Sequence, residues 1–343
     1  MSGRKKIKVL VIDDSLVFRE TLSRGLADDT GIEVVGTAAD VFEARDKIIE
    51  WEPDVLTLDV EMPKMDGIEF LRRLMPQYPL PTVMLSSVSG KVFDALQAGA
   101  VDFVTKPSVG SQCTMESMIA ELKVKIKIAS TANLSRWKTG GSVQHQANRS
   151  RIGWDPQMIA IGASTGGTEA TLDILRQLPA DMPGIVIVQH MPPVFTKMYA
   201  DRLNVSCRLK VKEAETGDPV VPGWALIAPG DRHMVVRKKG AGYVVECFPG
   251  DKINGHCPAV DVLFESVAKE AGRKALGIIL TGMGKDGAKG LLSMRNCGAR
   301  TFGQDESSSV VYGMPKEAFQ IGAVERQIPL NRMAKEIYSI ING

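Results

Sequence analysis

The feature that most constrains this chain is a repeated pairing of a short apolar run with an amphipathic stretch. The runs at 9–12, 55–58 and 83–85 are rich in branched residues, which is typical of parallel strands covered on both faces. Apolar residues recur three and four positions apart in the stretches between and after them, at 16–28, 41–51, 67–77, 90–98 and 114–127. Residues 1 to about 127 are therefore predicted to form five strand–helix units of an α/β sheet.

Polar residues follow these strands directly, at the sheet edge where ligands bind in parallel α/β proteins. Asp13 and Asp14 end the first strand, Asp59 ends another, Ser86 follows a third and Lys106 follows a fourth. Three carboxylates held close together repel one another, and a hard divalent cation relieves that repulsion. The sequence therefore predicts a Mg²⁺ site formed by Asp13, Asp14 and Asp59.

This group of residues has the chemistry of a phosphoacceptor site. Asp59 is the predicted nucleophile, since an aspartyl phosphate needs a carboxylate that faces the metal. Lys106 would neutralise the phosphoryl oxygens, and the Ser86 hydroxyl would bond the new phosphate and draw its loop inward. The alternative is an ordinary solvated rim with acidic strand ends, which any one of these residues alone would favour.

With the segments 59–63, 65–67 and 105–107, these residues make the first part of the chain similar to a two-component receiver domain. The resemblance covers residues 7 to about 127 and implies a flavodoxin-like fold that is phosphorylated by a histidine kinase in the presence of Mg²⁺. Phe103 falls where receivers commonly carry a switching aromatic residue. Ser86 stands where threonine is also common, so the hydroxyl group is kept.

The length of 343 residues exceeds one usual core, and a second domain is expected. No acidic residue occurs between Glu121 and Asp155, and the polar stretch 130–150 shows no sustained period, which indicates a tether. We predict a receiver domain at 1–127, a linker at 128–153 and a catalytic domain at 154–343. The basic charge of the tether is typical of a solvated linker, and no nucleic-acid partner is predicted.

Composition restricts the binding partners and the cellular location that can be expected. The net charge is only +2, so no global field attracts DNA or an anionic membrane. The basic amino end resembles a signal peptide until Asp13 and Asp14 interrupt its short apolar run, and no run approaches the roughly 18 residues needed to span a bilayer. The five cysteines are scattered without a Cys-x-x-Cys pair. Reduced thiols, a cytoplasmic location and no direct membrane insertion are therefore expected.

The predicted second domain opens with a strand at 158–161, the turn Gly162-Ala163-Ser164-Thr165-Gly166-Gly167 and a helical pattern at 168–175. This order can lift the Ser164 hydroxyl out of a sheet, and backbone N–H groups at the helix start can stabilise an oxyanion. The alternative is a phosphate or dinucleotide loop at the same point of the sheet. The Gly-x-Gly-x-x-Gly spacing of such loops is absent here.

A serine nucleophile needs a base, and the chain has only four histidines. His190 ends the run 184–189, predicted as the next strand of the same sheet, which makes it the favoured base, with His256 as the rival. Asp286, in the turn between the strand 275–280 and the helix 288–296, could accept the His190 N–H and fix its tautomer. The alternative for Asp286 is a structural aspartate at a helix start.

Residues 156–342 resemble the catalytic domain of the chemotaxis protein-glutamate methylesterases, the CheB family. The resemblance rests on five segments: 162–169, 189–191, 228–231, 258–264 and 281–287. It implies a second doubly wound, mainly parallel α/β domain in which Ser164, His190 and Asp286 hydrolyse glutamate methyl esters of chemoreceptors and release methanol. Deamidation of receptor glutamine is implied as well, with no cofactor for the ester step and an oxyanion hole at Thr165, Gly166 and Met283.

Two other functional classes remain open from the sequence. A phosphorylation-controlled DNA-binding regulator is a common fate of receivers, but the second domain is too large and lacks a compact basic helical unit. A binding module without chemistry would keep the same fold. The receiver is predicted to inhibit the esterase until Asp59 is phosphorylated, a hypothesis that follows from domain order alone.

Overall fold

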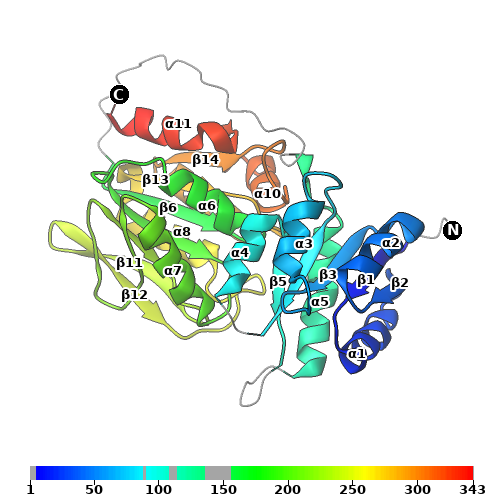
Figure 1. Ribbon diagram of the computed structural model, residues 1–343. Coiled ribbons are helices and arrows are strands. Elements are labelled where there is room, and N and C mark those ends of the chain that lie inside the picture. Colours follow the sequence, from blue (N-terminus) through cyan, green and yellow to red (C-terminus); the bar gives the residue numbers. More distant parts are fainter. Residues whose placement is uncertain (1–4, 88–89, 108–113, 136–155, 343) are drawn as a thin grey trace. The chain divides into compact units, whose positions relative to one another are not determined.

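The structure is a computed structural model that describes residues 5–87, 90–107, 114–135 and 156–342 (Figure 1). The chain separates into two compact units, Met1–Gly141 and Ser142–Gly343. Most of the predicted tether lies outside the described residues, as do His145 and Cys113. The boundaries predicted from the sequence therefore stay predictions, although the last receiver helix runs through Ala129, two residues past the expected end.

The first unit is a five-stranded parallel sheet in the order β2-β1-β3-β4-β5, the flavodoxin-like arrangement predicted for it. Its strands are β1 (Ile7–Ile12), β2 (Ile32–Ala38), β3 (Val55–Asp59), β4 (Thr82–Ser86) and β5 (Asp102–Thr105). Its helices are α1 (Leu16–Ala27), α2 (Val41–Trp51), α3 (Gly67–Leu74), α4 (Lys91–Ala98) and α5 (Met115–Ala129). Helix α1 contacts α5, and α3 contacts α4, so helices cover the buried strands.

Side-chain caps fix where several of these helices begin, close to the strand ends. Ser15 accepts a hydrogen bond from the backbone of Phe18, Asp40 accepts two at the start of α2, and Asp66 accepts one at the start of α3. The Ser15 N–H in turn donates to Asp13 Oδ1 at 2.9 Å. The hydrogen bonds of the Ser15 backbone and side chain therefore hold the loop between β1 and α1, next to the predicted acidic site.

The second unit is a seven-stranded parallel sheet in the order β15-β14-β13-β6-β7-β10-β8. Its strands are β6 (Met158–Ala163), β7 (Gly184–Gln189), β8 (Lys210–Glu213), β10 (Trp224–Ile227), β13 (Ala275–Ile279), β14 (Arg300–Gln304) and β15 (Arg326–Ile328). Its helices are α6 (Gly167–Leu175), α7 (Phe195–Ser206), α8 (Val260–Glu270), α9 (Ala288–Asn296), α10 (Met314–Gln320) and α11 (Leu330–Asn342), with a short 3₁₀ turn at Gly272–Lys274. The strand order reverses beside β6, where the chain goes first to β7 and later to β13. Such a switch point is where ligands bind in doubly wound sheets.

A small antiparallel sheet was not predicted from the sequence. It contains β9 (Pro219–Val220), β11 (His233–Lys239) and β12 (Gly242–Phe248), and it is visible as the yellow-green hairpin of Figure 1. Helix α8 packs against β11, and the Val236 N–H donates to the Ser266 hydroxyl of α8. The hairpin therefore supports the helix that faces the central strands.

A glycine in β6 brings α8 close to the sheet. A Cβ atom at Gly162 would lie 2.2 Å from a Val260 methyl carbon and 3.1 Å from the Phe264 ring. Any larger side chain there would displace α8, because buried packing leaves no room for the added atom. Helix α8 can therefore present its first backbone N–H groups to the end of β13.

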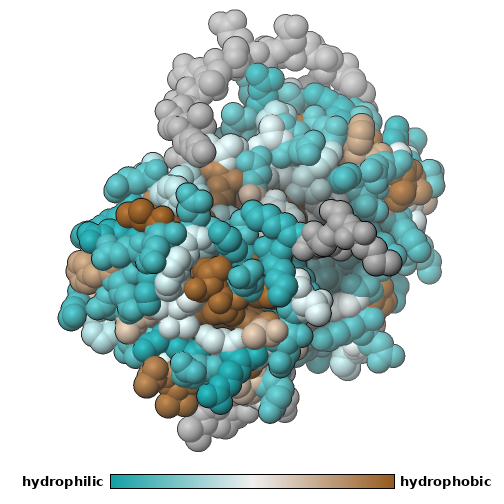
Figure 2. All heavy atoms as spheres, turned by 90° about the vertical axis from the view of Figure 1, so that its right-hand side faces the viewer, coloured by the Kyte–Doolittle hydropathy of each residue, from teal (hydrophilic) through white to brown (hydrophobic). Residues whose placement is uncertain are grey.

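Hydrophilic residues cover most of the face shown in Figure 2, with scattered hydrophobic residues between them. The exposed large hydrophobic side chains belong to many different elements, for example Leu16, Ile49, Val205 and Ile321. Exposed hydrophobic residues scattered in this way are normal for a folded protein. Among the described residues, no helix combines the length and the apolar character that crossing a membrane requires.

Candidate functional site

Ser164 lies directly after β6, in the strand–turn–helix geometry predicted for it. Its backbone N–H donates to the carbonyl of Thr281 at 3.0 Å, and its carbonyl accepts from the Gly167 N–H at 2.7 Å. Gly166 begins the turn into α6 with φ of +76°, a left-handed conformation that favours glycine. The tight turn therefore holds Ser164 at the carboxyl end of the sheet.

His190 occupies the equivalent position after the neighbouring strand β7. Ala163 pairs with Gln189 in register, so Ser164 and His190 are the first residues beyond the last pair of two adjacent strands. The His190 N–H donates to the Ala163 carbonyl at 3.1 Å. The Gln189 side-chain amide donates to the Ser164 carbonyl at 2.9 Å and ties the two turns together.

Asp286 lies in the turn between β13 and α9, on the other side of β6. Its Oδ2 atom is 2.8 Å from His190 Nε2, and the two side chains are only 1% and 6% exposed. Oδ2 also accepts the Val260 N–H at 2.7 Å, while Oδ1 accepts the Asp261 N–H at 3.1 Å and the Asn254 amide at 2.9 Å. The structure thus brings the predicted base and the predicted orienting carboxylate into direct contact.

These donors decide the charge of Asp286. Burial raises the pKa of the carboxyl, but the hydrogen bond and the charge of His190, with the Asn254 and Val260 donors, outweigh burial and lower the pKa to about 2. Asp286 is therefore ionised near neutral pH. An ionised carboxylate at Nε2 holds the ring in the tautomer that carries its proton there, which leaves Nδ1 as the basic nitrogen.

The side chains of Ser164 and His190 are not hydrogen-bonded to each other. Nδ1 of His190 is buried and has no hydrogen-bond partner among the described residues. A buried polar atom without a partner is costly in a native fold and occurs at functional sites. The unpaired Nδ1 atom of His190 is available to accept a proton, while the catalytic roles of the three residues stay predictions.

His256, the rival base, lies against the ring of His190 instead of Asp286. The two ring centroids are 3.6 Å apart with an angle of 8° between the planes. Burial, and then the charge of His190, lower the pKa of His256 to about 4, so His256 is neutral near neutral pH. The His256 ring therefore stacks on the His190 ring.

Asn254 and Asp261 belong to the site but were not singled out by the sequence reasoning as site residues. The Asn254 amide donates to Asp286 Oδ1 and, at 2.8 Å, to Asp261 Oδ2. Asp261 Oδ1 accepts the Gly290 N–H at 2.7 Å, and burial raises the pKa of this carboxyl. The only local signal was the Asn254-Gly255 pair, which indicates a turn and not a contact with Asp286.

The predicted oxyanion residues flank Ser164 on two sides. Thr165 is buried, and its carbonyl accepts the Thr281 hydroxyl at 2.9 Å. Gly166 is the residue before α6. Met283 belongs to the segment after β13, where a Cβ atom at Gly282 would lie 2.6 Å from Ser164 Cβ. These residues are placed near the nucleophile, and their binding of an oxyanion stays a prediction.

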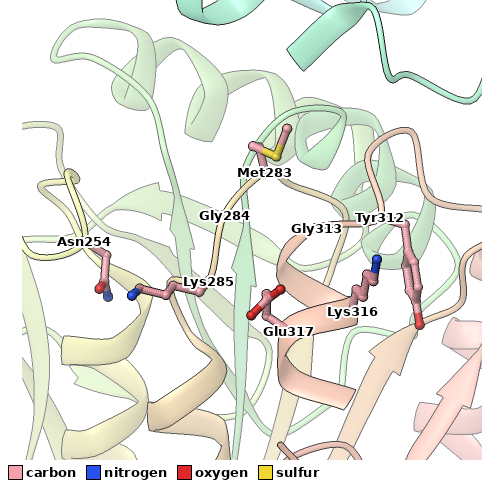
Figure 3. A pocket seen from close by; sticks show the side chains of 8 residues that line it. All are labelled: Asn254, Met283, Gly284, Lys285, Tyr312, Gly313, Lys316 and Glu317. Carbon is pink, nitrogen blue, oxygen red and sulfur yellow. The ribbon is translucent and has the colours of Figure 1, made fainter. Parts of the chain in front are cut away.

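A pocket of about 820 Å³ adjoins this site, with its lining shown in Figure 3. The lining comes from the loop of Asn254, the segment before α9 and the start of α10: Asn254, Met283, Gly284, Lys285, Tyr312, Gly313, Lys316 and Glu317. Asn254 contacts Asp286, and Met283 follows Gly282, which packs on Ser164, so the pocket lies close to both Ser164 and Asp286.

The first unit contains the predicted acidic site. Ligand oxygens of Asp13, Asp14 and Asp59 all lie within 4.8 Å of one another, and Asp13 and Asp59 are buried while Asp14 is exposed. Lys106 Nζ is 2.7 Å from Asp13 Oδ2 and 2.7 Å from Asp59 Oδ2. Three carboxylates around one exposed opening fit a hard divalent cation with oxygen ligands.

Burial has opposite effects on the charged residues of this acidic site. Burial raises the pKa of Asp59, and Lys106 opposes that change. Burial lowers the pKa of Lys106, but its bonds to Asp13 and Asp59 outweigh burial and raise it. Ser86 is buried at the end of β4, where its hydroxyl donates to the Ser87 carbonyl at 3.2 Å, and Phe103 is buried in β5. Their switching roles stay predictions.

Comparison with known proteins gives matches over both units. Residues 159–337 match the CheB methylesterase family, and residues 9–117 match the response regulator receiver domain. A protein-glutamate methylesterase/protein-glutamine glutaminase of Syntrophomonas wolfei is 59% identical over 345 residues, covering 98% of each chain. A relative with the same name from Syntrophotalea carbinolica is 54% identical, again over 98% of each chain. The crystal structure of the Thermotoga maritima CheB methylesterase catalytic domain is similar at a TM-score of 0.53 and 37% identity, covering 54% of this chain and 99% of that one. This chain belongs to the CheB methylesterase family and carries an amino-terminal receiver domain.

Proposed function

We propose that this protein hydrolyses glutamate methyl esters on chemoreceptors and that phosphorylation of Asp59 regulates the reaction. The observation that carries the proposal is the 2.8 Å contact between His190 Nε2 and Asp286 beside the turn of Ser164. The names of the full-length relatives support the same activity. A common acyl-transfer chemistry also accounts for the second activity in those names, hydrolysis of a glutamine amide.

The proposed reaction gives each of the three residues one role. Ser164 Oγ attacks the ester carbonyl while His190 Nδ1 takes the hydroxyl proton, and the Asp286 carboxylate stabilises the imidazolium that forms. His190 returns the proton to the departing methoxide, which leaves as methanol. A water molecule, deprotonated by His190, then attacks the acyl-enzyme. His190 returns that proton to Ser164 Oγ, and the substrate side chain leaves as glutamate. With glutamine as substrate, ammonia leaves in place of methanol.

The negative charge on the carbonyl oxygen needs donors near Ser164. Backbone N–H groups at Thr165, Gly166 and Met283 are the candidates, because they lie on two sides of the nucleophile. The ester step uses only groups of this chain and is proposed to need no cofactor. Chemoreceptor segments are the proposed substrate.

The receiver unit supplies the regulation. Asp13, Asp14 and Asp59 would hold Mg²⁺, which when bound would balance the charge of an incoming phosphoryl group. Asp59 would accept the phosphoryl group from a chemotaxis histidine kinase, and Lys106 lies within reach of the new phosphoryl oxygens. The Ser86 hydroxyl would bond the phosphate and move its loop, with Phe103 following in β5.

The first test of this proposal is methanol release from a methylated chemoreceptor fragment. Replacing Ser164 with alanine removes the nucleophile, so we expect release to fall by roughly 10³-fold or more. Ser206→Ala is the matched control, because Ser206 is exposed at the end of α7 and far from the triad in sequence. Methanol release by Ser164→Ala at the wild-type rate would contradict the serine mechanism.

A further inference from the structure

The pocket beside the triad has two walls that contact catalytic residues. On one wall, the Asn254 amide donates to Asp286 Oδ1 at 2.9 Å. Another part of the lining begins at Met283, directly after Gly282, where an added Cβ atom would meet Ser164 Cβ at 2.6 Å. A substrate whose ester carbonyl reaches Ser164 can therefore place neighbouring groups in this pocket.

The pocket carries more positive than negative charge. Lys285 and Lys316 are exposed, and within the described part of the chain neither ammonium group pairs with a carboxylate. Glu317 is the one carboxylate in the lining, and it is half-buried. By contrast, Arg300 and Arg326 in the adjacent strands β14 and β15 are both paired with glutamates. Two unpaired cations beside the triad remain available to a ligand.

The lining residues come from three segments: the loop of Asn254, the segment before α9 and the residues around the start of α10. Lys285 lies in the turn before α9 and extends toward Asn254, while Lys316 and Glu317 lie on α10 (Figure 3). The Tyr312 side chain closes one side, and its hydroxyl is bonded to the Gln327 amide, which fixes the ring. The pocket thus combines a flat aromatic wall with lysines on both sides.

We propose that this pocket binds a free carboxylate of the substrate, on an acidic side chain close to the methyl ester, through Lys285 and Lys316. This inference rests on the proposed esterase function. Each turnover converts an ester into a glutamate carboxylate, so a segment with several modifiable sites carries free carboxylates beside the remaining esters. The methylene groups of such a side chain would pack against Tyr312, and the positive charges of both lysines would attract its carboxylate.

Glu317 should repel the substrate carboxylate that Lys285 and Lys316 attract. Loss of a lysine charge and loss of the Glu317 charge should therefore change substrate preference in opposite directions. A pocket that only shapes the active-site surface would not show this opposition.

The experiment compares two methylated chemoreceptor fragments with the full-length protein. One fragment keeps the acidic residues next to the ester, and the other has them replaced by alanine. For each enzyme the measured quantity is the ratio of kcat/KM for the acidic fragment to kcat/KM for the alanine fragment. We expect Lys285→Gln and Lys316→Gln each to lower this ratio about two- to fivefold, the range of exposed charge pairs.

Three further variants complete the comparison. Glu317→Gln should raise the ratio, and Lys285→Arg, which keeps the charge, should restore it toward the wild-type value. Lys289→Gln, an exposed lysine on α9 outside the pocket lining, should leave the ratio unchanged. The same ratio in wild type and in the Lys285→Gln Lys316→Gln double variant, with both fragments hydrolysed, would overturn the inference alone. Absence of methanol from both fragments with the wild-type enzyme would overturn the proposed function and this inference with it.

Discussion

Two buried aspartates, Asp59 in the receiver unit and Asp286 in the catalytic unit, have pKa values shifted in opposite directions. Asp59 is the last residue of β3 and Asp286 follows β13, both strands of parallel sheets, and the two residues are 4% and 1% exposed. Asp286 accepts four hydrogen bonds, which lower its pKa to about 2 despite burial. Asp59 has the Lys106 ammonium at 2.7 Å and one long contact of 3.4 Å from the Glu61 N–H, and burial raises its pKa.

The difference shows that the donors around a carboxylate, and not its burial, decide what it can do. The donors of Asp286 come mostly from fixed elements, the start of α8 and the loop of Asn254, so its oxygens are fully occupied and can only hold His190. Asp59 is held mainly by one flexible lysine beside two other carboxylates. Its oxygens can exchange that partner for a metal ion and a phosphoryl group.

The largest expected effect in this comparison comes from Asp286→Asn. The amide keeps the size of the side chain but cannot balance the charge of the His190 imidazolium. Its NH₂ group would also favour the His190 tautomer in which Nε2 accepts a hydrogen bond. We expect kcat for methanol release to fall by about 10²- to 10⁴-fold with a much smaller change in KM. Asp201→Asn, an exposed aspartate of α7, is the matched control. A kcat within twofold of wild type in Asp286→Asn would remove Asp286 from the mechanism.

A smaller effect is expected when the receiver site is disabled. Chelation of Mg²⁺ should reduce phosphoryl transfer from a small phosphodonor to background, because the three carboxylates then repel the incoming group. Asp59→Asn should do the same, because it removes the nucleophile that accepts the phosphoryl group. Any stimulation of methanol release by the phosphodonor should disappear as well. A tenfold stimulation requires only about 1.4 kcal/mol of coupling between the two units.

The same chelation experiment separates the two sites. Hydrolysis by the unphosphorylated protein should continue at its original rate in the presence of the chelator, since Ser164, His190 and Asp286 work without a metal in the proposed mechanism. Phosphotransfer is followed with a radiolabelled donor and hydrolysis by methanol release in the same samples. If chelation stops both reactions equally, the assignment of the metal to the receiver unit alone is wrong.

The sequence predicted the parts of both sites that lie directly at strand ends. Asp59, Ser164 and His190 each follow a branched apolar run, and parallel strands bring such residues to one edge of the sheet. The flavodoxin-like fold and the doubly wound second domain were expected from the family resemblance, and the strand–helix alternation of the first 127 or so residues predicted an α/β sheet from the residues themselves. In these cases the local pattern of a few residues determines both the strand and the place where its polar neighbour emerges.

The remaining features depend on contacts between distant segments. Asn254 reaches Asp286 across 32 positions, and its local sequence indicates only a turn. The β11–β12 hairpin carried a signal, a two-residue turn between Lys239 and Gly242, but the prediction treated the domain as a run of parallel strands. The missing hydrogen bond between Ser164 and His190 depends on side-chain positions that spacing does not specify.

The smallest predicted effect concerns stability in acid, where protonation of the two aspartates should change the unfolding free energy in opposite directions. The folded-state pKa of Asp286 lies below the ordinary value of 3.8, so its contribution is fully present above about pH 4 and is lost as pH falls toward 2. That shift corresponds to roughly 2 kcal/mol of unfolding free energy. The folded-state pKa of Asp59 is raised, so protonation on acidification favours its folded unit instead.

Urea unfolding of wild type and Asp286→Asn between pH 5 and pH 2.5, followed by tryptophan fluorescence, measures this contribution. Other carboxylates titrate in both proteins, so their contributions cancel in the difference. Glu325 is an example: burial raises its pKa, but Arg300 lowers it by more. We expect the unfolding free energy of wild type to fall more steeply than that of Asp286→Asn, because the amide cannot take up a proton. Parallel curves for the two proteins over this range would mean that the hydrogen bonds to Asp286 leave its pKa where it is in the unfolded chain.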